Sequence, residues 1–127
     1  MLQLAVSLGQ LQMVRMLLAA GANVNTRNLH KPYRNISTAL HWAAWWKRPK
    51  IAEILIAVGA RVDARGSLRN PPLFDTAVMN TSGVAGVLLK HGVRTDLKDS
   101  YGMTPLKYAG EYRTRNGEDL VRLLKKP

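Results

Sequence analysis

The sequence predicts an all-α fold in which short helix pairs stack into a solenoid. The first observation is a repeat, because segments beginning at Thr38, Pro71 and Thr104 follow one another every 33 residues and match in register. The second observation is that each copy carries apolar residues at helical spacing, and the third is a glycine that ends this stretch in three copies. Because one such unit cannot bury its apolar face alone, neighbouring units must stack.

Each copy opens with a first helix. Pro72 and Pro105 stand at the start of this helix in two copies, where the missing N–H costs nothing. Small residues follow on one face and allow a neighbouring helix to approach closely. They are Ala43 and Ala44, Thr76 and Ala77, and Ala109 and Gly110.

A second helix follows the first, and its apolar positions have the spacing of a helix that is buried on one face. These positions are Met13, Val14, Leu17 and Leu18, then Ile51, Ile54 and Leu55, then Val84, Val87 and Leu88. Gly21, Gly59 and Gly92 come next and predict left-handed helix caps. A short extended stretch then leads into a turn.

Three departures from the period are visible. Gly21 and Gly59 are 38 residues apart, so five extra residues lie between Asn25 and Thr38. The first copy begins inside its first helix, which indicates either a fragment of a longer protein or a reduced cap. The last copy has about three inserted residues in "RTRNGE" and a polar end, as expected of a capping repeat.

The recurring pattern resembles the ankyrin repeat. The residues that carry the resemblance are Thr38, Leu40, His41, Ala43, Ala44, Gly59, Ala60, Val62 and Asp63, then Gly21 to Asn25, and Thr104, Pro105 and Leu106. It implies antiparallel helix pairs joined by β-turn fingers in an L-shaped array. We expect a single domain over residues 1–127, with repeats at approximately 1–27, 28–65, 66–98 and 99–127. The family pattern also implies that His41 hydrogen-bonds backbone near a finger, and the third copy departs from it with Phe74 and Asp75.

Charge and composition narrow the class of protein. Nineteen Lys and Arg against eight Asp and Glu give a net charge of +11, which indicates an acidic partner or a polyanion, or a bias that serves solubility. Cysteine is absent, so disulfides are excluded. No apolar run reaches the roughly 20 residues of a membrane helix, and the amphipathic start does not resemble a secretion signal. We expect a cytoplasmic, intracellular monomer without membrane contact.

No motif indicates catalysis or a bound cofactor. The sequence has no G-x-S-x-G, no phosphate loop and no Gly-rich dinucleotide turn. His30, His41 and His91 lack the spacing of metal ligands. We therefore expect a non-enzymatic protein with no metal and no cofactor.

The resemblance also implies where a partner binds. The two residues after the small pair end the first helix and face the concave groove of the array. Because they recur once per repeat, they predict a row across the stack. The row consists of Ser7 and Leu8, Trp45 and Trp46, Val78 and Met79, and Glu111 and Tyr112.

Three tryptophans stand close together in "TALHWAAWWKRPK". Trp42 is expected to pack the scaffold, and Trp45 and Trp46 are expected to be partly displayed. In the alternative, the enlarged first finger covers one or both indoles. Basic residues are expected along the same edge, among them Arg27, Lys31, Arg48, Lys50 and Arg61.

The predicted function is protein binding through the concave face and fingers, with an acidic or mixed apolar-acidic partner. Aromatic residues and Arg are the residue types favoured at such interfaces. The predicted contact residues are Trp45, Trp46, Met79, Tyr101, Tyr112 and Leu68, with Arg34, Lys47, Arg65 and Arg69 supplying charge. A basic nucleic-acid-binding module and an inhibitor or immunity-type factor are the alternatives.

Overall fold

The computed structural model describes residues 2–30, 35–66, 69–79, 81–111, 121–122 and 124. The first helices of the repeats are α1 (Leu2–Ser7), α3 (Ala39–Trp45), α5 (Pro72–Met79) and α7 (Pro105–Glu111). The second helices are α2 (Leu11–Ala19), α4 (Pro49–Ala57) and α6 (Ser82–Lys90). Strands β1 (Asn28–His30) and β2 (Asn35–Ser37) pair antiparallel within the first finger, with Leu29 opposite Ile36.

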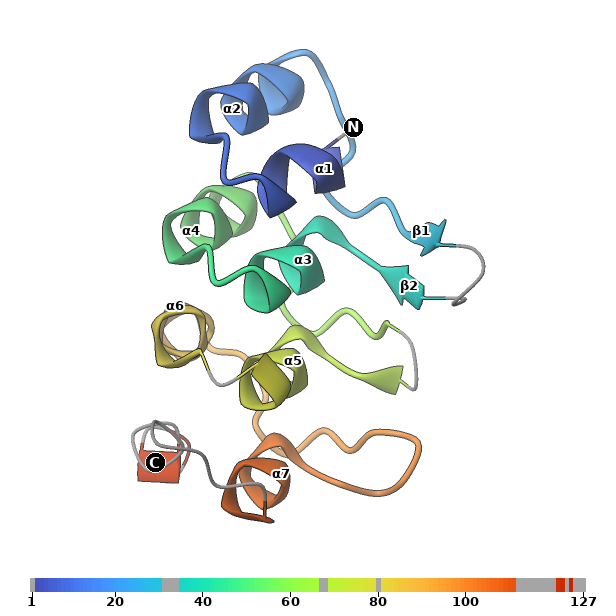
Figure 1. The fold of residues 1–127 in the computed structure, drawn as a ribbon, viewed down its shortest axis with the longest axis vertical. Helices are drawn as coiled ribbons and strands as arrows, with labels where there is room; N and C mark the ends of the chain where they lie inside the picture. The colour runs from blue at the N-terminus through green and yellow to red at the C-terminus, as the bar shows by residue number, and fades with distance from the viewer. Residues whose placement is uncertain are drawn as a thin grey trace.

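The helices form two parallel columns (Figure 1). Helices α1, α3, α5 and α7 stack in one column, α2, α4 and α6 stack in the other, and the fingers project from the side of the first column. Each first helix contacts the next first helix along the stack, and α2, α4 and α6 do the same. The predicted all-α solenoid of stacked helix pairs is therefore confirmed. In the described part of the chain no helix is long and apolar enough to span a bilayer.

The core lies between the columns and between successive repeats. Leu40 and Leu73 from the first helices, and Leu55 and Leu88 from the second helices, are completely or almost completely buried. These are equivalent positions of successive repeats, so each leucine packs in the same way one layer further along. Truncating a buried leucine to alanine costs about 2–5 kcal/mol, so each layer contributes substantially to stability.

The second helices end as predicted, in left-handed glycine caps. Gly21, Gly59 and Gly92 have φ of +95°, +102° and +76°. In the first cap, Gly21 N–H donates to Leu18 O at 3.1 Å and Ala22 N–H donates to Leu17 O at 3.0 Å. This pair of bonds satisfies two carbonyl groups that the helix end would leave without partners, and it recurs after α4 and α6.

The turn between the helices of a pair uses the same cap. After α1 the left-handed residue is Gly9, with φ of +69°, and after α3 it is Lys47, with φ of +56°. Arg48 N–H donates to Ala43 O at 2.9 Å across this turn. A residue with a Cβ pays about 1 kcal/mol in this conformation, so Lys47 is a strained position of the second repeat.

His41 orders the base of the finger that follows it, as the family pattern implied. Its Nδ1 accepts the Thr38 N–H at 3.2 Å and lies 2.9 Å from Thr38 Oγ1, and its Nε2 lies 2.9 Å from Asn70 O. An accepting Nδ1 leaves the proton on Nε2, which donates to that carbonyl. Burial lowers the pKa of His41 to about 4, so the ring is neutral at pH 7.

Successive fingers are tied together by the residue that follows each extended stretch. Asn25 Oδ1 accepts the Arg61 N–H at 2.8 Å, and the Asn25 amide donates to Gly59 O at 3.1 Å. One repeat later, Asp63 Oδ1 accepts the Arg94 N–H at 3.1 Å. These bonds fix the spacing of the fingers, and with it the spacing of the surfaces that they carry.

Candidate functional site

An exposed apolar row crosses three repeats at the ends of the first helices. Its members are the repeat-equivalent residues Leu8, Trp46 and Met79, together with Val78, and their exposed fractions are 58%, 51%, 37% and 43%. We call these four residues the apolar row. These large apolar side chains are exposed to solvent in the folded chain, so the row is a candidate contact surface.

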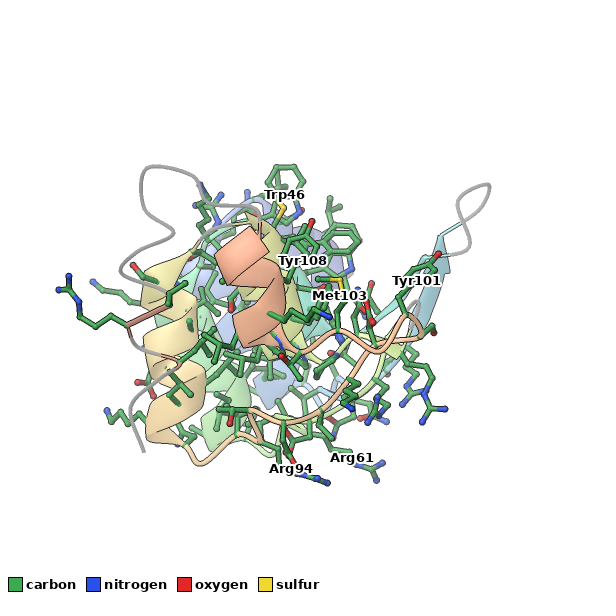
Figure 2. All side chains as sticks on the ribbon, turned by 90° about the horizontal axis from the view of Figure 1, so that it is seen from below. Trp46, Arg61, Arg94, Tyr101, Met103 and Tyr108 are labelled. Carbon is green, nitrogen blue, oxygen red and sulfur yellow. The ribbon has the colours of Figure 1, made fainter. Side chains whose placement is uncertain are left out.

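Trp46 is exposed because it stands one residue beyond the end of α3, where its N–H still bonds to Trp42 O at 2.9 Å. Figure 2 shows its indole at the rim of the molecule, on the side of Tyr108, Met103 and Tyr101. Tyr101 lies in the finger before α7 and is 75% exposed. The two most exposed aromatic groups of the described chain therefore share one side of the array.

The other two tryptophans are held by the scaffold. Trp42 packs partly buried against the core, and its indole N–H donates to Ser37 Oγ at 2.8 Å. The Trp45 ring is half-buried and leans on Trp42, with ring centroids 6.3 Å apart and planes tilted by 30°. Trp45 therefore supports the surface beside Trp46 and exposes less of itself.

Trp45 also hydrogen-bonds Asp75, a residue for which the sequence predicted no role. Asp75 is 3% exposed within α5. Burial raises the pKa of its carboxyl group well above the ordinary value, and hydrogen bonds from the Trp45 and Asn70 side chains partly oppose this. The signal in the sequence was a lone carboxylate at the helix position that holds Trp42 one repeat earlier, because that position faces the interior.

The predicted basic residues do not lie along one edge. Figure 2 places Arg61 and Arg94 on the opposite side of the finger layer from Trp46, so the prediction that Arg61 lies beside the tryptophans is wrong. The reason is that Arg61 follows the glycine cap of α4, at the far end of the helix pair from the α3–α4 turn. The sequence period shows which residues are equivalent in successive repeats. It does not show at which end of a helix pair those residues lie relative to the tryptophans.

Lys47 is the predicted basic residue nearest to Trp46 in the chain. It is exposed, and it lines a hollow of about 340 Å³ together with Gly9, Leu11, Arg48, Pro49, Lys50 and Ile51. Arg48 packs over Gly9 and donates to Ser7 O at 3.0 Å, so it links the first two repeats. The α3–α4 turn thus puts positive charge next to Trp46 in the chain.

Arg65 and Arg69 lie in the finger loops. Arg65 donates through one guanidinium nitrogen to Arg69 O at 3.1 Å and to Lys98 O at 2.8 Å, so it braces two neighbouring fingers. Arg69 is exposed and has φ of +61°, where the next finger has Gly102 at φ of +77°. Both arginines line a hollow that also contains Arg94. The predicted residues Arg34, Leu68 and Tyr112 lie outside the described residues.

No catalytic constellation is evident among the described side chains. Within residues 2–30, 35–66, 69–79 and 81–111, no three His, Asp or Glu side chains lie close enough to hold a metal ion. His41 is committed to the finger base, and His91 Nε2 lies 2.9 Å from Glu53 Oε2 at the surface. The exposed row and the charged hollows are therefore the features that remain as candidates for function.

Comparison with known proteins agrees with this architecture. A family model described as ankyrin repeats, in three copies, matches residues 1–66. The chain is 41% identical over 90 residues to the E3 ubiquitin-protein ligase Ufd4 of Drosophila melanogaster, a match that covers 71% of this chain and 3% of the ligase. It is 32% identical over 114 residues to the ankyrin repeat protein FPV232 of Fowlpox virus (strain NVSL), covering 89% of this chain and 23% of that protein.

The chain thus spans less than a quarter of either relative. The matched segments therefore report on the repeat scaffold, and the match does not extend to the activities of the whole relatives. Ankyrin repeats are generally protein–protein interaction modules and are typically not enzymes. Helix pairs, glycine caps, the His41 finger contact and the family match together show that this chain belongs to the ankyrin-repeat family.

Proposed function

We propose that the chain is a non-enzymatic module that binds a protein through the apolar row and the adjoining fingers. The observation that carries this proposal is the row itself, since Leu8, Trp46 and Met79 are equivalent residues of three successive repeats and all are exposed. Their common register places these apolar side chains in line along the stack. A partner that covers them would remove apolar area from water at about 25 cal/mol per Å².

Trp46 is the central contact of the proposed interface. Tryptophan is enriched among residues whose truncation costs an interface about 2 kcal/mol or more. The neighbouring rings of Trp42 and Trp45 are fixed by hydrogen bonds to Ser37 and Asp75. A side chain on such a rigid support loses little conformational entropy on binding.

The partner is proposed to carry acidic groups beside an apolar face. Lys47, Arg48 and Lys50 border the hollow at the α3–α4 turn, next to Trp46 in the chain. The net charge of +11 would steer an acidic partner and speed its association. Tyr101 supplies a second aromatic contact from the finger side in this proposal.

Several expectations drawn from the sequence remain predictions. They are the partner contacts of Arg34, Leu68 and Tyr112, the monomeric state, the intracellular location, and the single domain over residues 1–127 with repeats at approximately 1–27, 28–65, 66–98 and 99–127. The inhibitor or immunity-type role is a narrower version of the same proposal. It would require that the captured partner lose an activity of its own when bound.

The test is quantitative affinity capture from the native source with immobilised protein, comparing wild type with Trp46→Ala. Met16→Ala is the matched control, because Met16 is 64% exposed on α2, in the other helix column. We expect Trp46→Ala to lower the affinity for the captured partner about 30-fold, as a loss of 2 kcal/mol implies. Met16→Ala should retain wild-type affinity. Equal retention of the partner by both variants would exclude the apolar row as its binding site.

A further inference from the structure

The finger loops form another surface, which is charged and lies apart from the apolar row. Two hollows of about 630 Å³ and 510 Å³ lie there, and Arg65 lines both of them. The cationic side chains that line them are Arg27, Arg61, Arg65, Arg69, Arg94 and Lys98, and we call these six residues the basic finger face. Arg61 and Arg94 lie on the opposite side of the finger layer from Trp46 (Figure 2).

The period of the chain organises this face. Arg27, Arg65 and Lys98 occupy the same repeat position in three successive repeats, each six residues after a capping glycine. Arg61 and Arg94 occupy another shared position, two residues after the glycine. The cations therefore recur along the stacking axis and form a linear array.

Three carboxylates line the two hollows against the six cations, so this face keeps a net charge of +3. Asp63 Oδ1 accepts the backbone N–H of Arg94 at 3.1 Å. Asp96 pairs with the guanidinium group of Arg94 through two bonds of 3.0 Å and 3.2 Å. Asp99 Oδ1 accepts the backbone N–H groups of Tyr101 and Met103, both at 2.9 Å. The three carboxylates are thus engaged with Arg94 and the finger backbone.

We propose that the basic finger face binds the phosphate backbone of a double-stranded nucleic acid. A regular array of arginines fits a regular array of phosphates, since guanidinium groups recognise phosphate oxygens in a bidentate manner. Among the described residues that line the two hollows none is aromatic, and single-strand binding depends on aromatic stacking. The described part of this lining also contains no exposed large apolar residue that could anchor an acidic protein segment.

This surface would act independently of protein binding by the apolar row. Recognition through phosphates carries no base information, so binding is expected to be insensitive to sequence. Because Arg94 is paired with Asp96, about five of the six cations are left to neutralise one phosphate each. The slope of log affinity against log salt would then be roughly −4.5 on a DNA duplex. The dissociation constant would fall in the range of about 10⁻⁴ to 10⁻⁶ M at physiological salt.

The test measures fluorescence anisotropy of a labelled random-sequence DNA duplex of about 20 base pairs, and of the matching RNA duplex, at several salt concentrations. The variant Arg27→Gln, Arg61→Gln, Arg69→Gly removes three cations. Arg69→Gly also places glycine at the left-handed position that Gly102 occupies in the next finger, which preserves the fold. The control Arg15→Gln, Lys50→Gln, Arg122→Gln removes the same charge outside the two hollows.

We expect the first triple variant to weaken duplex binding on the order of 100-fold at 100 mM salt and to flatten the slope by about 2.7. The control variant and Trp46→Ala should stay within about threefold of wild type, because neither changes a phosphate contact of this face. DNA and RNA duplexes that bind alike identify the backbone as the ligand, and preference for one identifies the helix form that the array fits. Equal weakening by the control variant, salt-independent binding, or equally tight binding of poly-glutamate would overturn the proposal.

Discussion

The second and third repeats place different side chains at one equivalent position, and the difference shows how the scaffold tolerates exchange. In the second repeat His41 joins Thr38 to Asn70 O through its two ring nitrogens. In the third repeat Phe74 takes the place of His41 and packs on Tyr108, with ring centroids 5.1 Å apart. Both side chains are buried, but His41 orders the finger base by hydrogen bonds, whereas Phe74 in α5 packs on a ring of α7.

The residue three positions earlier explains the exchange. Thr38 offers a backbone N–H and a hydroxyl group to the imidazole. Pro71 occupies the equivalent position in the third repeat and has no N–H, so an imidazole there would lose this backbone donor. Phe74 needs no polar partner, which makes it compatible with Pro71.

The two repeats also respond to pH in opposite directions. Burial lowers the pKa of His41 to about 4, so this residue contributes stability above pH 6.5 that is lost as the pH falls toward 4. Burial raises the pKa of Asp75 well above 3.8, so its contribution is present below pH 3.8 and is lost as the pH rises through the folded-state pKa. Two neighbouring repeats of the same fold thus carry buried groups whose contributions to stability change with pH in opposite directions.

The largest effect on stability is expected for His41→Ala, which removes the hydrogen-bonding side chain that distinguishes the second repeat from the third. This change leaves a cavity and removes the partner of the Thr38 N–H, so the free energy of unfolding should fall by about 3–5 kcal/mol. Urea denaturation followed by circular dichroism measures it. His91→Ala, at an exposed contact with Glu53, should stay near wild-type stability. Similar losses in the two variants would contradict the role assigned to His41.

The next largest effect is the pH dependence of the second repeat. Between pH 7 and pH 4 protonation of His41 in the unfolded chain should remove about 3 kcal/mol of stability. His41→Gln does not titrate, so its unfolding free energy should lack this contribution over the same range. Denaturation curves at pH 7, 5.5 and 4 compare the two proteins, and parallel pH profiles would show that His41 is not the responsible group.

A smaller effect of opposite sign is expected at Asp75. Asp75→Asn keeps an acceptor for the Trp45 indole but carries no charge, so it should raise the unfolding free energy at pH 7 by about 1–3 kcal/mol. The gain should shrink as the pH falls and vanish below about pH 3.8, where Asp75 is neutral in both states. A gain that is the same at pH 7 and pH 3.5 would contradict this account.

The smallest effect concerns the turn between helices. Lys47 has φ of +56° where the first repeat has Gly9 at +69°, and the third repeat has Asn80 at the same sequence position. Lys47→Gly should relieve strain and raise stability by about 0.5–1 kcal/mol. Lys50→Gly, inside α4, should instead lower stability by a similar amount. Thermal unfolding of the two variants separates the turn from a general effect of lysine removal.

Much of the fold was predictable because it depends on local register. The period located the helix pairs, and glycine at residues 21, 59 and 92 marked the helix ends where left-handed caps are found. The same period placed Leu8, Trp46 and Met79 in one row, and their exposure agrees with that placement. Their role in binding a partner stays a prediction.

Two features of the site could not be read from the period. The first is the bond between Trp45 and Asp75, which joins residues 30 positions apart in different repeats. The second is the separation of Arg61 and Arg94 from Trp46 by the finger layer. Both depend on how one repeat sits on the next, and the pattern within a single repeat does not contain that information.

The amino-acid pattern alone predicted the class of scaffold, the ends of its second helices and the residues that recur at each repeat position. It did so because helix periodicity and the backbone freedom of glycine are local properties. Only the folded structure shows that Asp75 is buried and hydrogen-bonded to the Trp45 indole. It also shows that Arg61 and Arg94 lie on the opposite side of the finger layer from Trp46. The physical reason is that burial and facing direction arise from contacts between stacked repeats, which come into existence only when the chain has folded.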